Sequence, residues 1–182
     1  MVPPRGQYQI CGPNAFSRYV WDEQVPHRVY AYNNKISGEL RIGRVALSLI
    51  KVTDERLGAT ETFETPDGAQ AVYSSRMRAL VDAVYDWSRF DSLPRGYDWI
   101  RRELAKSDNA AKELVDVALE FGNVSTLRRL GKLLELEGVK ESLLAKIEQA
   151  ITPSPALIAW VPNYPKRGAT DRRWGVICND KR

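Results

Sequence analysis

The sequence has very few of the residues that build metal centres and disulfide frameworks. Its 182 residues include two cysteines, Cys11 and Cys178, and a single histidine, His27. Without a second histidine near a cysteine, the usual ligand spacings of a zinc site cannot be formed. We therefore expect no metal and no cofactor. We expect two free thiols in a reducing compartment rather than a disulfide.

Long hydrophobic runs are also missing. No stretch approaches the roughly 18 apolar residues of a membrane-spanning helix. The N-terminal "MVPPRGQYQI" lacks the apolar segment of a secretory signal. We therefore expect a soluble cytoplasmic protein with no membrane partner.

Signatures of nucleotide binding and of covalent catalysis are absent as well. The sequence contains no Walker loop, no G-x-G-x-x-G and no G-x-S-x-G. Carboxylates stand beside lysines and arginines, as in "DERLGATETFE" and "LLELEGVKE", which is typical of a solvated surface. Because no two carboxylates form an acid and base pair, we expect a protein that is not an enzyme.

The residue pattern that is present changes near Ser74. Residues 7–73 contain short runs rich in β-branched and aromatic residues, separated by turn signals, and predict a mainly β half with one short helix at "PNAFSRYVW". Residues 74–151 have a helical period and predict four to five helices. Residues 157–179 predict a β-pair that returns to the first sheet, which favours a single α+β domain over residues 1–182.

The stretch "GNVSTLRRLGKLLELEG" predicts a helix capped by Asn123 or Ser125. It could be the recognition helix of a helix-turn-helix, with Arg128 and Arg129 toward phosphate or guanine. Alternatively, it packs through its leucines, and Gly131 lets another helix approach closely. The leucines are about one residue out of step with a helix-turn-helix core, which favours packing. The outer edge would then expose Arg128 and Lys132 and leave the arginines outside or paired with Glu135.

The stretch "NYPKRGATDRRWGVIC" concentrates positive charge in a glycine-containing hairpin. Interleaved cationic and aromatic side chains can bind phosphates and bases, or an acidic protein surface. The alternative is a soluble loop on a strand that buries its apolar residues. The net charge of +4 suits an acidic partner but is too small to decide between these interpretations. The cations are Lys166, Arg167, Arg172 and Arg173.

These two stretches resemble the C-terminal domain of AbiEi-type antitoxins from type IV toxin–antitoxin systems. That family has a leucine-rich helix with an R-L-G triplet, matched here by residues 129–131. Its closing strand has a G-x-x-D-x-x-W-like pattern, matched by Gly168, Asp171 and Trp174. The family's segment ending in L-L-D is similar to Leu80, Val81 and Asp82 within "SSRMRALVDAV", and its interdomain junction is similar to "RGQYQICGPNAFSRY".

The resemblance implies a non-enzymatic antitoxin or transcriptional-regulator domain that helps to neutralise a nucleotidyltransferase-like toxin. The family's N-terminal winged helix, which binds operator DNA, is expected to be largely absent from this chain. A nucleic-acid-binding regulator acting through a basic surface is the alternative. Candidate contacts with toxin or nucleic acid are Lys166, Arg167, Arg172, Arg173, Arg128, Arg129 and Lys132.

Overall fold

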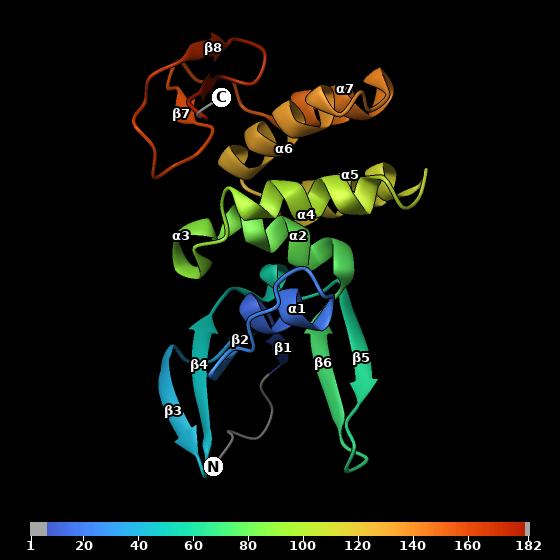
Figure 1. Ribbon diagram of the computed structural model, residues 1–182, viewed down its shortest axis with the longest axis vertical. Coiled ribbons are helices and arrows are strands. Elements are labelled where there is room, and N and C mark those ends of the chain that lie inside the picture. The colour runs from blue at the N-terminus through green and yellow to red at the C-terminus, as the bar shows by residue number, and fades with distance from the viewer. Residues whose placement is uncertain (1–6, 181–182) are drawn as a thin grey trace. The chain divides into compact units, whose positions relative to one another are not determined.

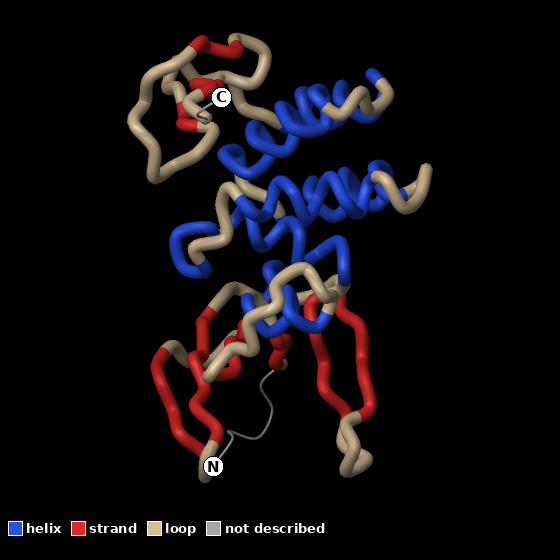
Figure 2. The backbone as a smooth tube through the Cα atoms, in the orientation of Figure 1, coloured by secondary structure: helices blue, strands red, loops and turns tan. Residues whose placement is uncertain are grey.

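The computed structural model describes residues 7–180 and confirms the α+β class. The chain divides into two compact units, one up to Ala79 and one from Leu80, where the sequence predicted a single domain. The boundary falls inside a helix. Helices and strands are labelled in Figure 1 and coloured by type in Figure 2.

The first unit contains the six strands that the short β-rich runs predicted, one helix and one 3-10 turn. The order along the chain is β1 Tyr8–Ile10, α1 Pro13–Arg18, β2 Arg28–Asn33, β3 Gly38–Ile42, β4 Val45–Lys51, η1 Asp54–Arg56, β5 Thr60–Glu64 and β6 Gln70–Ser74.

These strands form one mixed sheet in the order β3-β4-β2-β1-β6-β5. The hairpins β3–β4 and β5–β6 are antiparallel, whereas β2 runs parallel to β4 and β1 parallel to β6. Residues opposite each other in register share a face of the sheet, and the faces alternate along each strand. Leu40 lies opposite Leu47, and Leu47 lies opposite Val29, so one face is apolar across β3, β4 and β2.

The helix α1 contacts the sheet at β2 and β5. Its Pro13 occupies the first turn, where a missing N–H costs nothing, and Ala15 and Phe16 are buried. The Arg18 guanidinium lies 3.9 Å from the centre of the Phe63 ring in β5. The Tyr19 hydroxyl donates to the Ser74 carbonyl at 2.8 Å, which ties the end of α1 to β6.

Within the described residues the second unit contains α2 from Leu80 onward, five further helices and three short strands. The five longer helices were predicted, and the four-residue α3 was not. The elements are α2 Arg76–Tyr85, α3 Trp87–Phe90, α4 Arg95–Leu104, α5 Ala110–Phe121, α6 Val124–Leu136, α7 Glu141–Ala150, β7 Ile158–Ala159, β8 Ala169–Asp171 and β9 Val176–Cys178.

The expectation that the C-terminal β-pair returns to the first sheet is wrong. The strands form a separate sheet in the order β7-β9-β8, with β7 parallel to β9 and β8 antiparallel to it. The segments that follow β7 and β9 are also joined, because the Asn179 side-chain amide accepts from the Val161 N–H at 2.8 Å and donates to the Val161 carbonyl at 2.9 Å. The Tyr97 ring stacks on Trp160 at 4.1 Å and its hydroxyl donates to the Trp160 carbonyl, which fixes the strand end against α4.

Two further predictions concern the membrane and the cysteines. Within residues 7–180 no helix is long and apolar enough to cross a membrane. Cys11 is buried in the first unit and Cys178 is half-buried in the second, and no disulfide joins them.

The first testable prediction concerns the start of α6. Asn123 is the N-cap, and its Oδ1 accepts from the Thr126 N–H at 2.8 Å. Replacing Asn123 by Ala should lower the free energy of unfolding by about 1 kcal/mol, because it leaves one helix N–H without its acceptor. The matched control is Asn109→Ala, since the Asn109 side chain does not cap α5. Urea unfolding followed by circular dichroism measures both, and equal effects would contradict the capping role.

Candidate functional site

The candidate site is built on a contact between α6 and the C-terminal strands. A Cβ atom at Gly131 would overlap the ring carbons of Trp174, so only glycine admits the indole against this helix. The sequence predicted that Gly131 allows close approach of another helix. The partner is instead the Trp174 side chain, which is 1% exposed.

The indole and backbone of Trp174 are held by carboxylates. Its Nε1 donates to Glu135 of α6 at 3.0 Å, and its backbone N–H donates to Asp171 at 3.1 Å. Asp171 in turn pairs with the Lys132 ammonium at 2.8 Å. Burial raises the pKa of Asp171, but the hydrogen bonds from Lys132 and the Trp174 N–H outweigh it and hold the pKa below its usual value.

Lys132 does not lie on an open outer edge as predicted. Its side chain is only 14% exposed because it lies over Asp171. Burial lowers the Lys132 pKa, whereas the ion pair with Asp171 raises it by more, so the ammonium keeps its charge. The lysine therefore joins α6 to β8 and is a poor candidate for contact with a partner.

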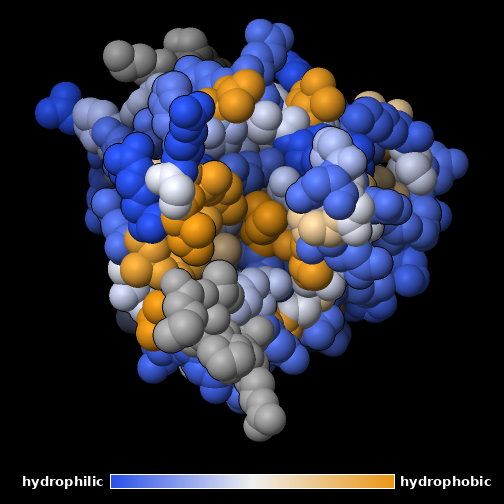
Figure 3. Space-filling view, turned by 90° about the horizontal axis from the view of Figure 1, so that it is seen from below, coloured by the Kyte–Doolittle hydropathy of each residue, from blue (hydrophilic) through white to orange (hydrophobic). Residues whose placement is uncertain are grey.

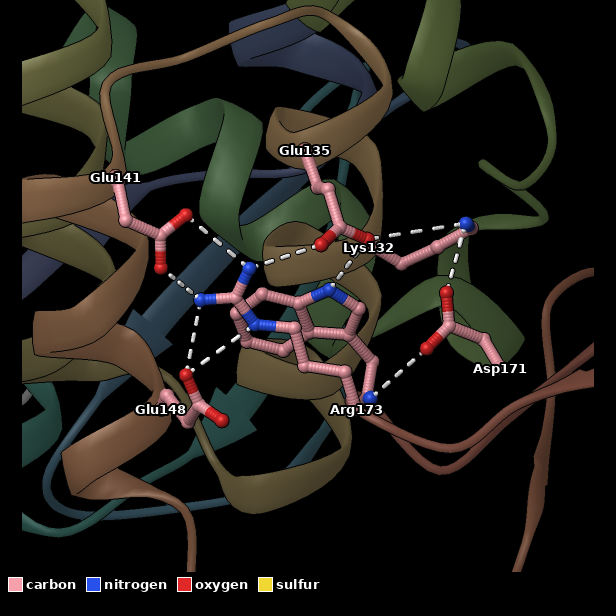
Figure 4. Close-up of polar contacts among 7 residues, drawn as sticks. Lys132, Glu135, Glu141, Glu148, Asp171 and Arg173 are labelled. Carbon is pink, nitrogen blue, oxygen red and sulfur yellow. Dashed lines mark hydrogen bonds and ion pairs between the residues drawn. The ribbon is translucent and has the colours of Figure 1, made fainter.

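Arg173 lies in the middle of three glutamates (Figure 4). Its guanidinium pairs with Glu135 and Glu148, each at 2.9 Å, and with Glu141. These hydrogen bonds raise the pKa of Arg173 and lower the pKa of Glu141. Because glutamates of α6 and α7 neutralise its charge, Arg173 connects these helices to the β8–β9 turn.

Arg128 and Arg129 are buried, contrary to the expectation that they line an exposed face. Each residue is 6% exposed. The Arg128 Nε donates to the Trp174 carbonyl at 2.7 Å, and the Arg129 Nε donates to the Ala159 carbonyl at 3.2 Å. The α6 helix buries Thr126 to Gly131 continuously, so it has no free face there for reading DNA.

The remaining predicted cations, Lys166, Arg167 and Arg172, are exposed. They lie in two loops rather than one hairpin, because β8 separates them. Lys166 and Arg167 belong to the connection between β7 and β8, and Arg172 begins the turn between β8 and β9. Among residues 7–180, none of the three has a carboxylate partner within ion-pair distance.

A cavity of about 420 Å³ adjoins the β8–β9 turn. Arg128 contributes to the wall of this cavity although only 6% of the residue is exposed. Gly175 lies so close to the Arg128 guanidinium that a Cβ there would overlap it. Arg128 has no ion pair with any described carboxylate, and its Nε donates instead to the Trp174 carbonyl. The cavity is lined by Arg128, Glu148, Ile151, Pro153, Ser154, Pro155, Leu157, Arg172, Arg173, Trp174 and Gly175.

The glutamates that neutralise Arg173 were missed by sequence reasoning. They stand 25 to 38 residues away from the arginine, so no local spacing connects them to it. Nothing in the described part of the chain groups three or more His, Cys, Asp or Glu side chains for a metal ion.

Comparisons with known proteins give one distant structural similarity. No family model and no curated protein matches the chain. Among solved structures, the chain is similar to the crystal structure of the RV2827C protein from Mycobacterium tuberculosis, with 14% sequence identity and a TM-score of 0.47. The match covers 93% of this chain and 61% of that chain, so this chain spans less than two thirds of that protein.

The second prediction tests the contact between Gly131 and Trp174. Replacing Gly131 by Ala should lower the free energy of unfolding by about 1–3 kcal/mol, because the indole must move out of its place. This loss runs against the helix propensity of Ala, which alone would stabilise by about 1 kcal/mol. Gly96→Ala in α4 is the control, since a Cβ there meets its neighbours at an ordinary 3.4 Å.

Thermal and urea unfolding decide between these outcomes. Gly96→Ala should be neutral or stabilising, and the near-ultraviolet circular dichroism of Gly131→Ala should change because the environment of Trp174 changes. Stabilisation of both variants would mean that Trp174 does not occupy this position.

Proposed function

We propose that this chain is a non-enzymatic antitoxin domain that helps to neutralise a nucleotidyltransferase-like toxin by binding. The sequence resemblance supplies the family, and one packing arrangement supports it. The two halves of the resemblance meet, because Gly131 receives Trp174 and Asp171 caps the Trp174 N–H. Gly168 also lies against the Cys178 carbonyl, where a Cβ would overlap it. A family signature made of packing residues would have this arrangement.

The binding role is supported by the fact that the predicted cations fall into two groups, those occupied in packing and those exposed to solvent. Arg128, Arg129, Lys132 and Arg173 are occupied in packing, whereas Lys166, Arg167 and Arg172 face solvent without a carboxylate partner in the described chain. Exposed cations without partners attract a surface of opposite charge and increase its association rate. We therefore assign the contact with an acidic surface of the toxin to these three residues.

A nucleic-acid-binding regulator is the second candidate function. The observation that favours it is Tyr164, which is 37% exposed in the loop that carries Lys166 and Arg167. An exposed aromatic ring beside cations can stack on a base while the cations contact phosphates. Such a surface would bind duplex or single-stranded nucleic acid with little sequence preference.

The third prediction tests the proposed toxin contact. The variant Lys166→Glu/Arg167→Glu/Arg172→Glu should fold as the wild type and lose neutralisation in cells that express a nucleotidyltransferase-like toxin that the wild type neutralises. The reason is that three attractive charges become repulsive toward an acidic surface. Growth rescue and co-purification with the toxin measure the effect. Because the cations lie in two loops, the pair Lys166→Glu/Arg167→Glu and the single Arg172→Glu should be measured separately.

Two controls separate binding from folding. Lys112→Glu changes an exposed cation of α5 whose partner is Asp116, and it should leave neutralisation intact. Arg173→Ala should lower thermal stability, because three glutamates lose their common partner. Full neutralisation by the folded triple variant would exclude this surface.

The fourth prediction concerns the alternative. If the loops bind nucleic acid, affinity for generic duplex DNA should fall steeply as salt rises, with a slope of log affinity against log salt set by the number of phosphate contacts. The triple variant should lower that slope by about 2 to 3, close to one per cation removed. Fluorescence anisotropy over a salt series measures it. Absence of binding at low salt would remove this alternative.

A further inference from the structure

The strand β3 is one outer edge of the six-stranded sheet and is exposed at all five residues. Its apolar side chains, together with the first residue of β4, stay open to solvent: Leu40 is 41% exposed, Ile42 44% and Val45 49%. Hydrophobic side chains gather in several clusters on the side of the molecule seen in Figure 3. Exposed apolar edge strands are templates for pairing, and proteins usually protect them with Pro, Lys or inward-facing charge. The apolar face of β3 has none of these.

The hairpin turn determines which backbone groups of β3 are available. Ile42 pairs with Val45 across the two-residue loop of Gly43 and Arg44, and Gly43 has a positive φ of 60°. In a two-residue hairpin the residues that close the loop are a hydrogen-bonded pair, and the pattern alternates from there. Ile42, Leu40 and Gly38 therefore direct their N–H and C=O groups toward β4. Glu39 and Arg41 direct theirs outward, away from the sheet.

Only some registers join two outward-facing copies of β3. In antiparallel pairing, the outward-facing residues Glu39 and Arg41 of one copy must lie opposite the outward-facing residues of the other copy. When the pairing is centred on Leu40, Glu39 of each copy lies opposite Arg41 of the other. A shift to either side sets Glu39 against Glu39 or Arg41 against Arg41. Opposite charges stabilise a cross-strand pair and like charges destabilise it.

The same register fits the apolar face. Leu40 meets Leu40 of the second copy as a non-hydrogen-bonded pair, in which side chains come closest. Ile42 lies opposite Gly38, where a Cβ would have no neighbour within 4 Å, so there is room for the larger side chain. Arg41 has no acidic partner within the described chain, and Glu39 keeps 69% of its side chain exposed beside its ion pair with Arg28. Both charges are thus open to a second strand.

The other edge of the sheet does not have this property. The strand β5 has the sequence TETFE, so antiparallel self-pairing centred on Thr62 sets Glu61 opposite Phe63 and Thr60 opposite Glu64. This strand carries two glutamates and no cation, so two copies repel each other. The edge β5 is therefore protected against self-pairing, whereas β3 is self-complementary.

We propose that β3 is a self-association edge, which pairs antiparallel with β3 of a second copy about a two-fold axis at Leu40. The partner is this chain itself, and the two sheets become one continuous sheet. An isologous contact of this kind closes after two copies and does not propagate. One short strand on each side forms a small interface, so we expect a weak dimer whose population depends on concentration.

A charge swap on the full chain tests the proposal. Sedimentation velocity over a concentration series should show the wild type moving from monomer toward dimer. Arg41→Glu places Glu opposite Glu at both symmetric positions and should weaken dimerisation about tenfold. The double variant Glu39→Arg/Arg41→Glu restores opposite charges and should return the dissociation constant to within about threefold of the wild type.

Disulfide trapping tests the register directly. Non-hydrogen-bonded residues have Cα atoms about 4.5 Å apart, within reach of a disulfide. Leu40→Cys should therefore form a covalent dimer under mild oxidation. Thr62→Cys at the centre of β5 is the matched control and should form no covalent dimer, and neither should the wild type with its own two cysteines. Circular dichroism checks that each variant is folded.

The proposal is overturned if the wild type stays monomeric at every concentration and Leu40→Cys forms a covalent dimer no faster than Thr62→Cys. It is equally overturned by a dimer that responds alike to the single and the double charge variant. Both results are independent of neutralisation, so the toxin contact and the dimer edge can fail separately.

Discussion

The indole of Trp174 against Gly131 is the contact on which the second unit depends. A side chain on residue 131 would prevent it, and with the ring in place each neighbour is positioned. Glu135, one turn along α6, then reaches the indole N–H, and the backbone of Trp174 receives Arg128 on its carbonyl. The preceding residue, Arg173, then pairs with glutamates of both α6 and α7. One glycine therefore sets the place of the β8–β9 turn.

This arrangement explains why the positive charges of the C-terminal segment are not equivalent. Arg173 and Lys132 flank the indole and are matched by carboxylates, which costs little because both partners remain partly hydrated. Arg128 and Arg129 instead lie among backbone carbonyls, and burial lowers the pKa of Arg129. Charged groups are rarely buried without such partners. The cations that remain available to a binding partner are those that stay exposed and take no part in packing.

The sequence predicted the parts of the fold that depend on local periodicity. Short runs of β-branched and aromatic residues between turn signals identified every strand of the first sheet, and Asn123 marked the start of α6. The sequence did not predict strand pairing or side-chain burial where these depend on contacts between residues far apart in the chain. The six helices separate the C-terminal strands from the first sheet along the chain, and no local pattern reveals that β7 and β9 pair with each other. The arginines of α6 were misplaced because the helix was assumed to have one solvated face, whereas Trp174, far along the chain, covers it.

Charge is more informative here by arrangement than by amount. A net charge of +4 predicts little, yet the distribution of that charge separates three situations. Around Trp174 the signs alternate within one chain, so the charges are satisfied and stabilise the fold. In the β7–β8 and β8–β9 loops, Lys166, Arg167 and Arg172 are exposed and have no carboxylate partner in the described chain, so their charge is available to a partner of opposite sign. In β3 the two signs alternate along an open edge, and because an antiparallel strand reverses its order, the partner that matches this alternation is the same strand.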